Sequence, residues 1–222
     1  MLKPNKYFLF LNYKYPPKDF SFYRRKIKSG VTVAVDGGVR FFLKNNIIPD
    51  IIIGDFDSAP PLSKKYLAQT EVIVFPTAKD KTDSHLALEL ALERGAGEIE
   101  IFGGVSSSEI DHTLGNLFLL ELVNKFNRDY KRKVKARLVG PGYEAAMIEN
   151  GQGDFAGNKG DFLSIIPLSA GPIVDFTGLV YPPPKRPLRI GDSLSLRNQF
   201  SGQHAHIKVR GKAAVVVLHK LR

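Results

Sequence analysis

The feature that most constrains the fold is an alternation of short apolar runs with stretches of helical spacing, which continues to about residue 140. Strands separated by helices run in the same direction, so this order is typical of an α/β domain with a parallel sheet. The predicted strands are residues 7–12, 31–36, 50–55, 71–76, 98–104 and 135–140. The predicted helices are residues 37–46, 83–97 and 111–126, and the last is mostly apolar, so we expect it to be well buried.

After about residue 143 the pattern changes to short apolar runs separated by Gly and Pro, without a helical pattern. The predicted strands of this part are residues 161–168, 172–181, 193–200, 204–210 and 213–219. Their length and alternation favour a small antiparallel sandwich or barrel. The sequence therefore predicts two domains: a parallel-sheet (Rossmann-like) α/β domain over residues 1–142, and an all-β sandwich or barrel over residues 143–222.

Composition excludes some chemistry and leaves other possibilities open. The absence of cysteine excludes disulfides, thiolate metal sites and a thiol nucleophile, and agrees with a cytoplasmic location. The apolar run near the N-terminus is too short for a membrane span, so we expect no membrane association. With 32 Lys and Arg against 22 Asp and Glu, the net charge is +10, which would suit nucleic acid, a membrane surface or an anionic small substrate. A solvated basic surface is the simpler interpretation of that charge.

Carboxylates follow the predicted strands repeatedly. They are Asp36, Asp55, Asp57, Asp80, Asp83 and Asp111. Parallel-sheet proteins bind ligands at the carboxyl ends of their strands, so we expect these side chains to share one edge of the sheet. Each also has a purely structural interpretation, as a turn residue or, for Asp83 and Asp111, as a helix cap. Clustered carboxylates repel one another unless they are neutralised, and their oxygens suit Mg²⁺, which is commonly shared with substrate phosphates.

Groups that suit phosphate lie close to these carboxylates. Lys79 and Lys81 supply compact positive charges, and Gly103, Gly104 and residues 106–108 offer backbone amides and hydroxyls ahead of a predicted helix. There is no Walker-type lysine loop and no G-x-G-x-x-G fingerprint, and the histidines lack zinc-ligand spacing. The combination indicates nucleotide phosphate chemistry.

Several segments, in order and at similar spacing, resemble the thiamine pyrophosphokinase family. They are VDGGVRFFL (35–43), IPDIIIGDFDS (48–58), FPTAKDKTDSHLAL (75–88), GGVSSSEIDHTLGNLFLL (103–120) and parts of residues 160–218. The resemblance covers about residues 7–218. It implies an α/β domain followed by a β-sandwich, a homodimer, no nucleic-acid partner, and transfer of the pyrophosphoryl group of ATP to the hydroxyl of thiamine, which gives thiamine diphosphate and AMP.

The resemblance also implies roles for individual residues. The magnesium and phosphate-site carboxylates of the family match Asp36, Asp55, Asp57 and Asp83. The catalytic positions of the family match Asp55, Asp57, Asp83 and Asp111. The resemblance implies that the ATP site is lined by Asp36, Gly37, Asp80, Lys81, Thr82, Gly103 and Ser106. It implies that the substrate is contacted by Asp111, His112, Arg197 and Asn198. It also implies that residues 143–222 form part of the thiamine site at a dimer interface.

Three positions depart from the family pattern. Glu109 replaces an arginine, Arg197 replaces a serine, and His85 replaces a glutamate. A carboxylate cannot bind phosphate as a guanidinium does. Either another basic residue compensates or the acceptor is a different heterocyclic alcohol. A nucleic-acid-binding or scaffold role, with an inactive carboxylate cluster, is a third possibility.

Overall fold

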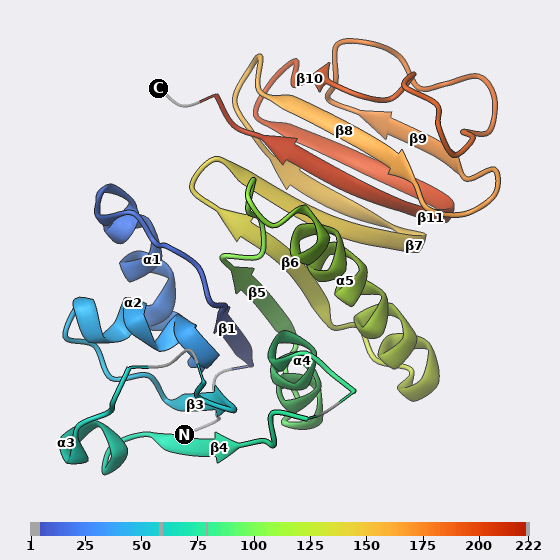
Figure 1. The fold of residues 1–222 in the computed structure, drawn as a ribbon. Coiled ribbons are helices and arrows are strands. Elements are labelled where there is room, and N and C mark those ends of the chain that lie inside the picture. The colour runs from blue at the N-terminus through green and yellow to red at the C-terminus, as the bar shows by residue number, and fades with distance from the viewer. Residues whose placement is uncertain (1–4, 58–59, 79, 221–222) are drawn as a thin grey trace. The chain divides into compact units, whose positions relative to one another are not determined.

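The computed structural model describes residues 5–57, 60–78 and 80–220 (Figure 1). The chain divides into two compact units, Met1–Pro141 and Gly142–Arg222. The first contains the parallel strands and the helices, and the second is antiparallel. Within the described residues, no helix is long and apolar enough to cross a membrane.

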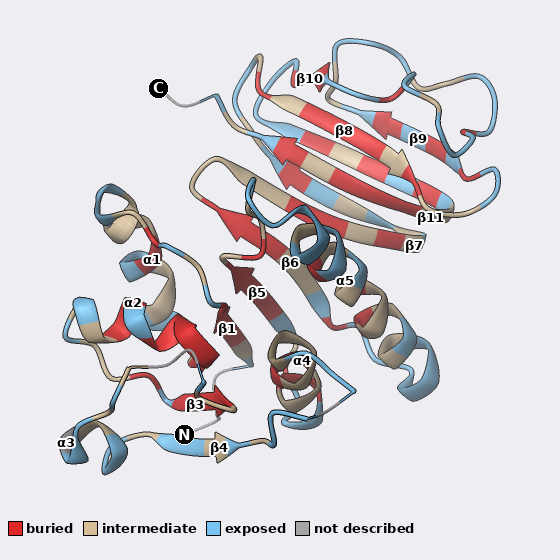
Figure 2. Ribbon diagram, in the orientation of Figure 1, coloured by how far each residue is buried: buried red, intermediate tan, exposed pale blue. Residues whose placement is uncertain are grey.

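In its described residues, the first unit contains six parallel strands. They are β1 (Lys6–Phe10), β2 (Val31–Val35), β3 (Ile51–Gly54), β4 (Glu71–Val74), β5 (Glu98–Phe102) and β6 (Lys135–Gly140). Their order in the sheet is β6-β5-β1-β2-β3-β4, with every neighbouring pair parallel. All six predicted strands are therefore present. Figure 2 shows the difference between the inner strands, which are largely buried, and the edge strand β4, where Val74 is 67% exposed.

Helices and short 3₁₀ turns connect these strands. They are η1 (Pro17–Asp19), α1 (Phe20–Lys26), η2 (Ile27–Ser29), η3 (Asp36–Gly38), α2 (Val39–Lys44), α3 (Lys64–Leu67), α4 (Asp83–Glu93) and α5 (Ile110–Tyr130). The three predicted helices correspond to α2, α4 and α5, whereas α1 and α3 were not predicted. Thr82, rather than Asp83, caps α4, because its hydroxyl accepts a hydrogen bond from the His85 amide at 3.3 Å.

An aromatic cluster forms much of the core of the first unit. Phe10 of β1 lies at its centre, with its ring centroid 4.6 Å from that of Phe41, 4.8 Å from Phe42 and 4.9 Å from Phe102. Phe41 and Phe42 come from α2, so the cluster fixes that helix against β1 and β5. Such ring pairs add to the stabilisation gained from burial.

The expectation that the helix over residues 111–126 is well buried was wrong. Only Asn116, Leu120 and Val123 of α5 are buried, while Leu114 and Phe118 are about half exposed. The helix packs on β6 and α4 through one stripe of side chains, so apolar residues elsewhere on its surface remain accessible.

The second unit is an antiparallel sheet. Its strands are β7 (Tyr143–Ala156), β8 (Phe162–Pro167), β9 (Ile173–Thr177), β10 (Asn198–Gln199) and β11 (His204–Leu218). Strand β11 pairs with β7, β8 and β9, and β10 pairs with β8. Inward side chains of these strands form one apolar core that includes Phe155, Ile207 and Val215.

The strands of the second unit differ from the prediction in four respects. Residues 204–210 and 213–219 form the single strand β11, which has a register shift between Val209 and Lys212 at Gly211, where φ is 99°. Strand β7 was missed. Of residues 193–200, only Asn198 and Gln199 pair as a strand, and β9 ends at Thr177 because Gly178 turns the chain with a φ of 81°.

Candidate active site

The candidate site lies at the carboxyl ends of β1 and β5, where the sheet order reverses. The chain passes from β1 to β2 on one side and from β5 to β6 on the other, so the connections diverge and leave a crevice. The loops that follow the two strands, represented by Asn12 and Gly103, line a cavity of about 460 Å³ that we call the acidic cavity. Asp36 and Asp55, which follow β2 and β3, also line it.

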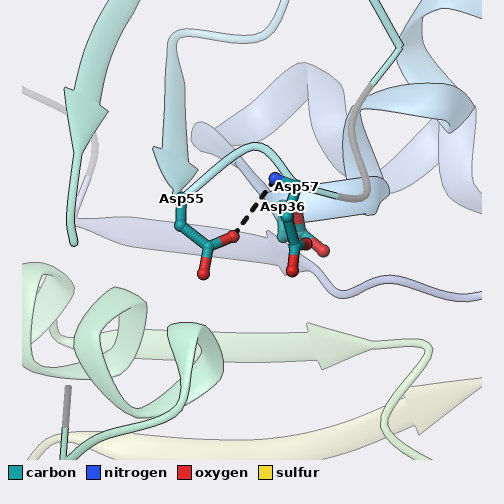
Figure 3. Close-up of side chains that lie close together, drawn as sticks. All are labelled: Asp36, Asp55 and Asp57. Carbon is teal, nitrogen blue, oxygen red and sulfur yellow. Dashed lines mark hydrogen bonds between the residues drawn. The ribbon is translucent and has the colours of Figure 1, made fainter. Parts of the chain in front are cut away.

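Three carboxylates converge there. Oxygen atoms of Asp36, Asp55 and Asp57 all lie within 4.8 Å of one another. Figure 3 shows the three side chains together, with the Asp57 amide donating a hydrogen bond to Asp55 Oδ1 at 3.3 Å. Asp36 is only 8% exposed, and its Oδ1 atom is buried without a hydrogen-bond partner among the described residues. An orphaned carboxylate oxygen in a cluster of like charge is unfavourable unless a cation neutralises it.

The backbone is strained where it brings these carboxylates together. Asp36 has a φ of 46° and Phe56 a φ of 63°, conformations that cost non-glycine residues about 1–3 kcal/mol each. Gly54 ends β3 with a φ of 154° and lies directly against the Asp36 backbone. The turn through Phe56 therefore brings Asp57 back towards Asp36.

Most of the sequence-predicted site residues line the same cavity. Asp36, Asp55, Asp80, Lys81, Thr82, Asp83, Gly103, Ser106 and His112 all do so. Asp57 belongs to the carboxylate cluster but not to this lining, and Gly37 is buried beside Asp36. Asp111 is exposed in the first turn of α5 and is not a lining residue. Lys79 falls outside the described residues.

Lys81 is already engaged by a carboxylate. Its Nζ lies 2.8 Å and 2.7 Å from the two oxygens of Glu89, and His85 Nε2 lies 3.3 Å from the same group. Burial acts to raise the pKa of Glu89, but Lys81 and His85 outweigh it and hold that pKa below its usual value. An anionic ligand would have to compete with Glu89 for Lys81.

Two α5 residues that the sequence analysis missed hold the loop after β5. Thr113 Oγ1 accepts a hydrogen bond from the Ser106 amide at 2.9 Å and donates one to the Ser106 carbonyl at 2.9 Å. Asn116 Nδ2 donates to the Gly104 carbonyl at 3.2 Å. A polar pair spaced three residues apart in an apolar helix is the signal that could have identified them.

The two predicted site residues of the second unit have different surroundings. Asn198 lines an apolar cavity of about 390 Å³, but its amide is committed to the Tyr181 backbone, with bonds to the Tyr181 N–H and carbonyl at 3.0 Å each. Arg197 does not line this cavity, and its guanidinium lies 4.0 Å from the centroid of the Phe162 ring. Asn198 therefore shapes the cavity by holding the proline-rich segment 181–184.

The acidic cavity lies where the order of the open parallel sheet reverses, and it is lined by carboxylates, a lysine and a glycine-containing loop. These features are typical of nucleotide-binding α/β proteins. Comparison with known proteins narrows this class. Residues 24–131 match the family model described as thiamin pyrophosphokinase, catalytic domain. The chain is 31% identical to the thiamine pyrophosphokinase of Bacillus subtilis (strain 168) over 172 residues. The matched region covers 76% of this chain and 77% of that relative. The chain therefore belongs to the thiamine pyrophosphokinase family.

Solved structures agree with this assignment. The crystal structure of thiamine pyrophosphokinase from Bacillus subtilis matches with a TM-score of 0.77 at 26% identity, over 97% of this chain and 100% of that chain. Thiamin pyrophosphokinase from Candida albicans matches with a TM-score of 0.75 at 18% identity, over 96% and 88% of the two chains. At 18% identity, the likeness to the Candida albicans structure concerns the fold alone. The mixed α/β and antiparallel β architecture is thus shared with these proteins.

Proposed function

We propose that this chain is a thiamine pyrophosphokinase, which transfers the pyrophosphoryl group of ATP to the hydroxyl of thiamine. In this reaction the hydroxyl oxygen bonds to the β-phosphorus, and the bond from that phosphorus to the oxygen shared with the α-phosphorus breaks, which releases AMP. The observation that carries the proposal is the convergence of Asp36, Asp55 and Asp57, with one buried carboxylate oxygen that has no hydrogen-bond partner within the described part of the chain.

The carboxylate cluster suits Mg²⁺. Hard oxygen ligands at this separation match the preference of that ion, and the buried Oδ1 atom of Asp36 is a ready ligand. We assign Asp36, Asp55 and Asp57 as metal-binding residues and add Asp83, which lines the same cavity. A bound Mg²⁺ would neutralise phosphate charge and orient the β-phosphorus.

ATP would occupy the acidic cavity. Asp80, Lys81 and Thr82 line one side of it, and Gly103 and Ser106 line the side formed by the loop after β5. Gly37, beside Asp36, has no side chain, and the Asn12 and Arg40 side chains pack directly against it. These groups position the triphosphate, and positioning with charge neutralisation supplies most of the catalysis in phosphoryl-group transfer. On this proposal, residues 1–142 are the ATP- and Mg²⁺-binding domain.

Thiamine would bind through residues 143–222. The apolar cavity beside Asn198 suits an uncharged part of the acceptor. Because Arg197 is directed at Phe162, its positive charge is not part of the cavity lining, which removes the main reason to infer a different acceptor. The same proposal includes a homodimer in the cytoplasm.

A carboxylate would accept the proton of the attacking hydroxyl. Asp111 and the metal-binding aspartates are the candidates. The acidic cavity is lined by Asp36, Asp55 and Asp83 but not by Asp111, which favours one of the former. Undiminished turnover by Asp111→Asn would exclude an essential proton-accepting role for Asp111.

Product analysis tests the function directly. The protein is incubated with ATP, Mg²⁺ and thiamine, and both products are identified by chromatography and mass spectrometry. We expect AMP and thiamine diphosphate, and no reaction with Asp55→Asn. ADP would indicate transfer of a single phosphoryl group. AMP formed only with another alcohol would mean a changed acceptor, and absence of nucleotide turnover with every acceptor would contradict the proposal.

A further inference from the structure

A second cavity adjoins the acidic cavity within the first unit. It has a volume of about 620 Å³ and shares Asn12, Ser106 and Glu109 with its neighbour. Its other lining includes the aromatic residues Tyr13, Tyr15 and Phe41 and the cations Lys14, Arg40 and Lys44. We call it the cationic cavity.

The two cavities have opposite charge. Among the described residues, the cationic cavity has three cations against the single carboxylate of Glu109. Counted over the described residues alone, the acidic cavity has five carboxylates, one of them Glu109, against the single lysine Lys81, which Glu89 engages. An ATP molecule carries several negative charges, so the acidic cavity alone would repel it except through a metal ion. The cationic cavity supplies the adjacent positive charge.

Arg40 stands at the boundary between the cavities. Its Nη1 donates a hydrogen bond to Asn12 Oδ1 at 3.0 Å, and Asn12 lines both cavities. A Cβ placed on Gly37 would collide with both of these atoms. The guanidinium therefore occupies the space that a side chain at Gly37 would fill, beside Asp36 of the carboxylate cluster.

The position of Arg40 is relevant to the replacement of the family arginine by Glu109. The family pattern has an arginine where Glu109 lies, and Glu109 lines both cavities without contributing positive charge. A guanidinium binds phosphate through paired, charge-assisted hydrogen bonds. Arg40 reaches the same boundary from α2 rather than from the loop before α5.

We propose that Arg40, supported by Lys44 and Lys14, forms an anion subsite that binds phosphate oxygens of the nucleotide in place of the arginine that this chain lacks at position 109. The inference rests on the proposed function, since it places the nucleotide in the neighbouring acidic cavity. It assigns the cationic cavity a ligand class, the phosphate groups of ATP or its products. Arg40 is a phosphate-binding residue of this chain in particular.

Binding measurements with matched ligands test the subsite. Titration calorimetry compares ATP, inorganic pyrophosphate and adenosine, each with Mg²⁺ and with a chelator. We expect Arg40→Gln to weaken binding of ATP and of pyrophosphate by about tenfold, the size of a charged hydrogen bond. Adenosine binding should stay unchanged. Lys28→Gln, which removes an exposed lysine outside both cavities, is the control and should bind every ligand like the parent.

Rescue separates a phosphate contact from a structural role of Arg40. Glu109→Arg restores the family residue, so adding it to Arg40→Gln should recover most of the lost ATP affinity. Equal loss of ATP and adenosine binding, or no rescue, would overturn the inference, because Arg40 would then act by holding Asn12. Lys44→Gln provides an independent test if Arg40→Gln does not fold, with an expected loss of about threefold for ATP and pyrophosphate and none for adenosine.

The two proposals fail in different ways. A parent protein that binds ATP but does not convert thiamine would contradict the proposed function and leave the subsite intact. Normal pyrophosphoryl transfer, with Arg40→Gln binding ATP as tightly as the parent, would contradict the subsite alone.

Discussion

Gly54 lies against the backbone of Asp36, and a Cβ at Gly54 would come 3.1 Å from the Asp36 Cα atom. Gly54 ends β3, and Asp36 directly follows the neighbouring parallel strand β2. This contact lets the segment that carries Asp55 and Asp57 approach Asp36, so the glycine determines how closely the carboxylates gather.

Gly54→Ala should destabilise the protein and disrupt the cluster. The substitution adds a methyl group against backbone and imposes a φ of 154° on an L-residue, which we expect to lower the free energy of unfolding by about 1–3 kcal/mol. Urea denaturation measures this loss. Gly115→Ala is the matched control: a Cβ there meets nothing within 4 Å and lies inside α5, so it should stabilise by about 0.5–1 kcal/mol. Equal effects of the two substitutions would contradict the importance of the Gly54 contact.

Asp36→Asn should remove most of the stabilisation by Mg²⁺. Loss of one of three adjacent negative charges relieves repulsion, so without metal the variant should melt at or above the temperature of the parent. Saturating Mg²⁺ at about a hundred times its dissociation constant stabilises a binding protein by about 2.7 kcal/mol, and the variant should lose most of this increment. Differential scanning calorimetry with and without Mg²⁺ measures both effects. Asp129→Asn, at an exposed position near the end of α5, should keep the full shift.

The parallel sheet could be predicted because each strand is a compact apolar run, such as Ile51–Gly54. The carboxylates could then be identified because they follow the ends of these strands. Strand β7 was not predicted because Asn150, Gly151 and Gln152 interrupt the apolar alternation, while long pairing with β11 sustains the strand. The position of Arg40 at the cavity boundary was not predicted, because it is set by a hydrogen bond to Asn12, which is 28 residues away in the chain. Contacts between distant segments have no local signal.

Glu89→Gln should increase the affinity for ATP. Glu89 holds the Lys81 ammonium with two short bonds, and a neutral amide would release the lysine for phosphate oxygens. Because the pair is partly exposed, the gain should be modest, about twofold to fivefold in the dissociation constant. Titration calorimetry measures it, with Glu93→Gln at an exposed position on the same helix as the control. Unchanged or weaker ATP binding by Glu89→Gln would exclude competition for Lys81.

Asp161 should make the second unit sensitive to acid. Its carboxylate is 1% exposed and accepts hydrogen bonds from the Asn158 and Lys220 amides at 2.9 Å and 3.0 Å, with His219 Nδ1 also at 3.0 Å. Burial tends to raise the pKa of Asp161, but these partners outweigh it and lower that pKa from 3.8 to about 2.

A lowered folded-state pKa means that the ionised group stabilises the fold above pH 3.8, and that this contribution is lost as the pH falls from 3.8 towards 2. Asp161→Asn should therefore cost about 2 kcal/mol at pH 7, and the difference from the parent should shrink as the pH falls through this interval. Urea denaturation between pH 2 and pH 7 measures the difference. Asp175→Asn, at an exposed position on β9, should be nearly neutral throughout. A cost for Asp161→Asn that does not vary with pH would show that shape, rather than charge, accounts for the role of Asp161.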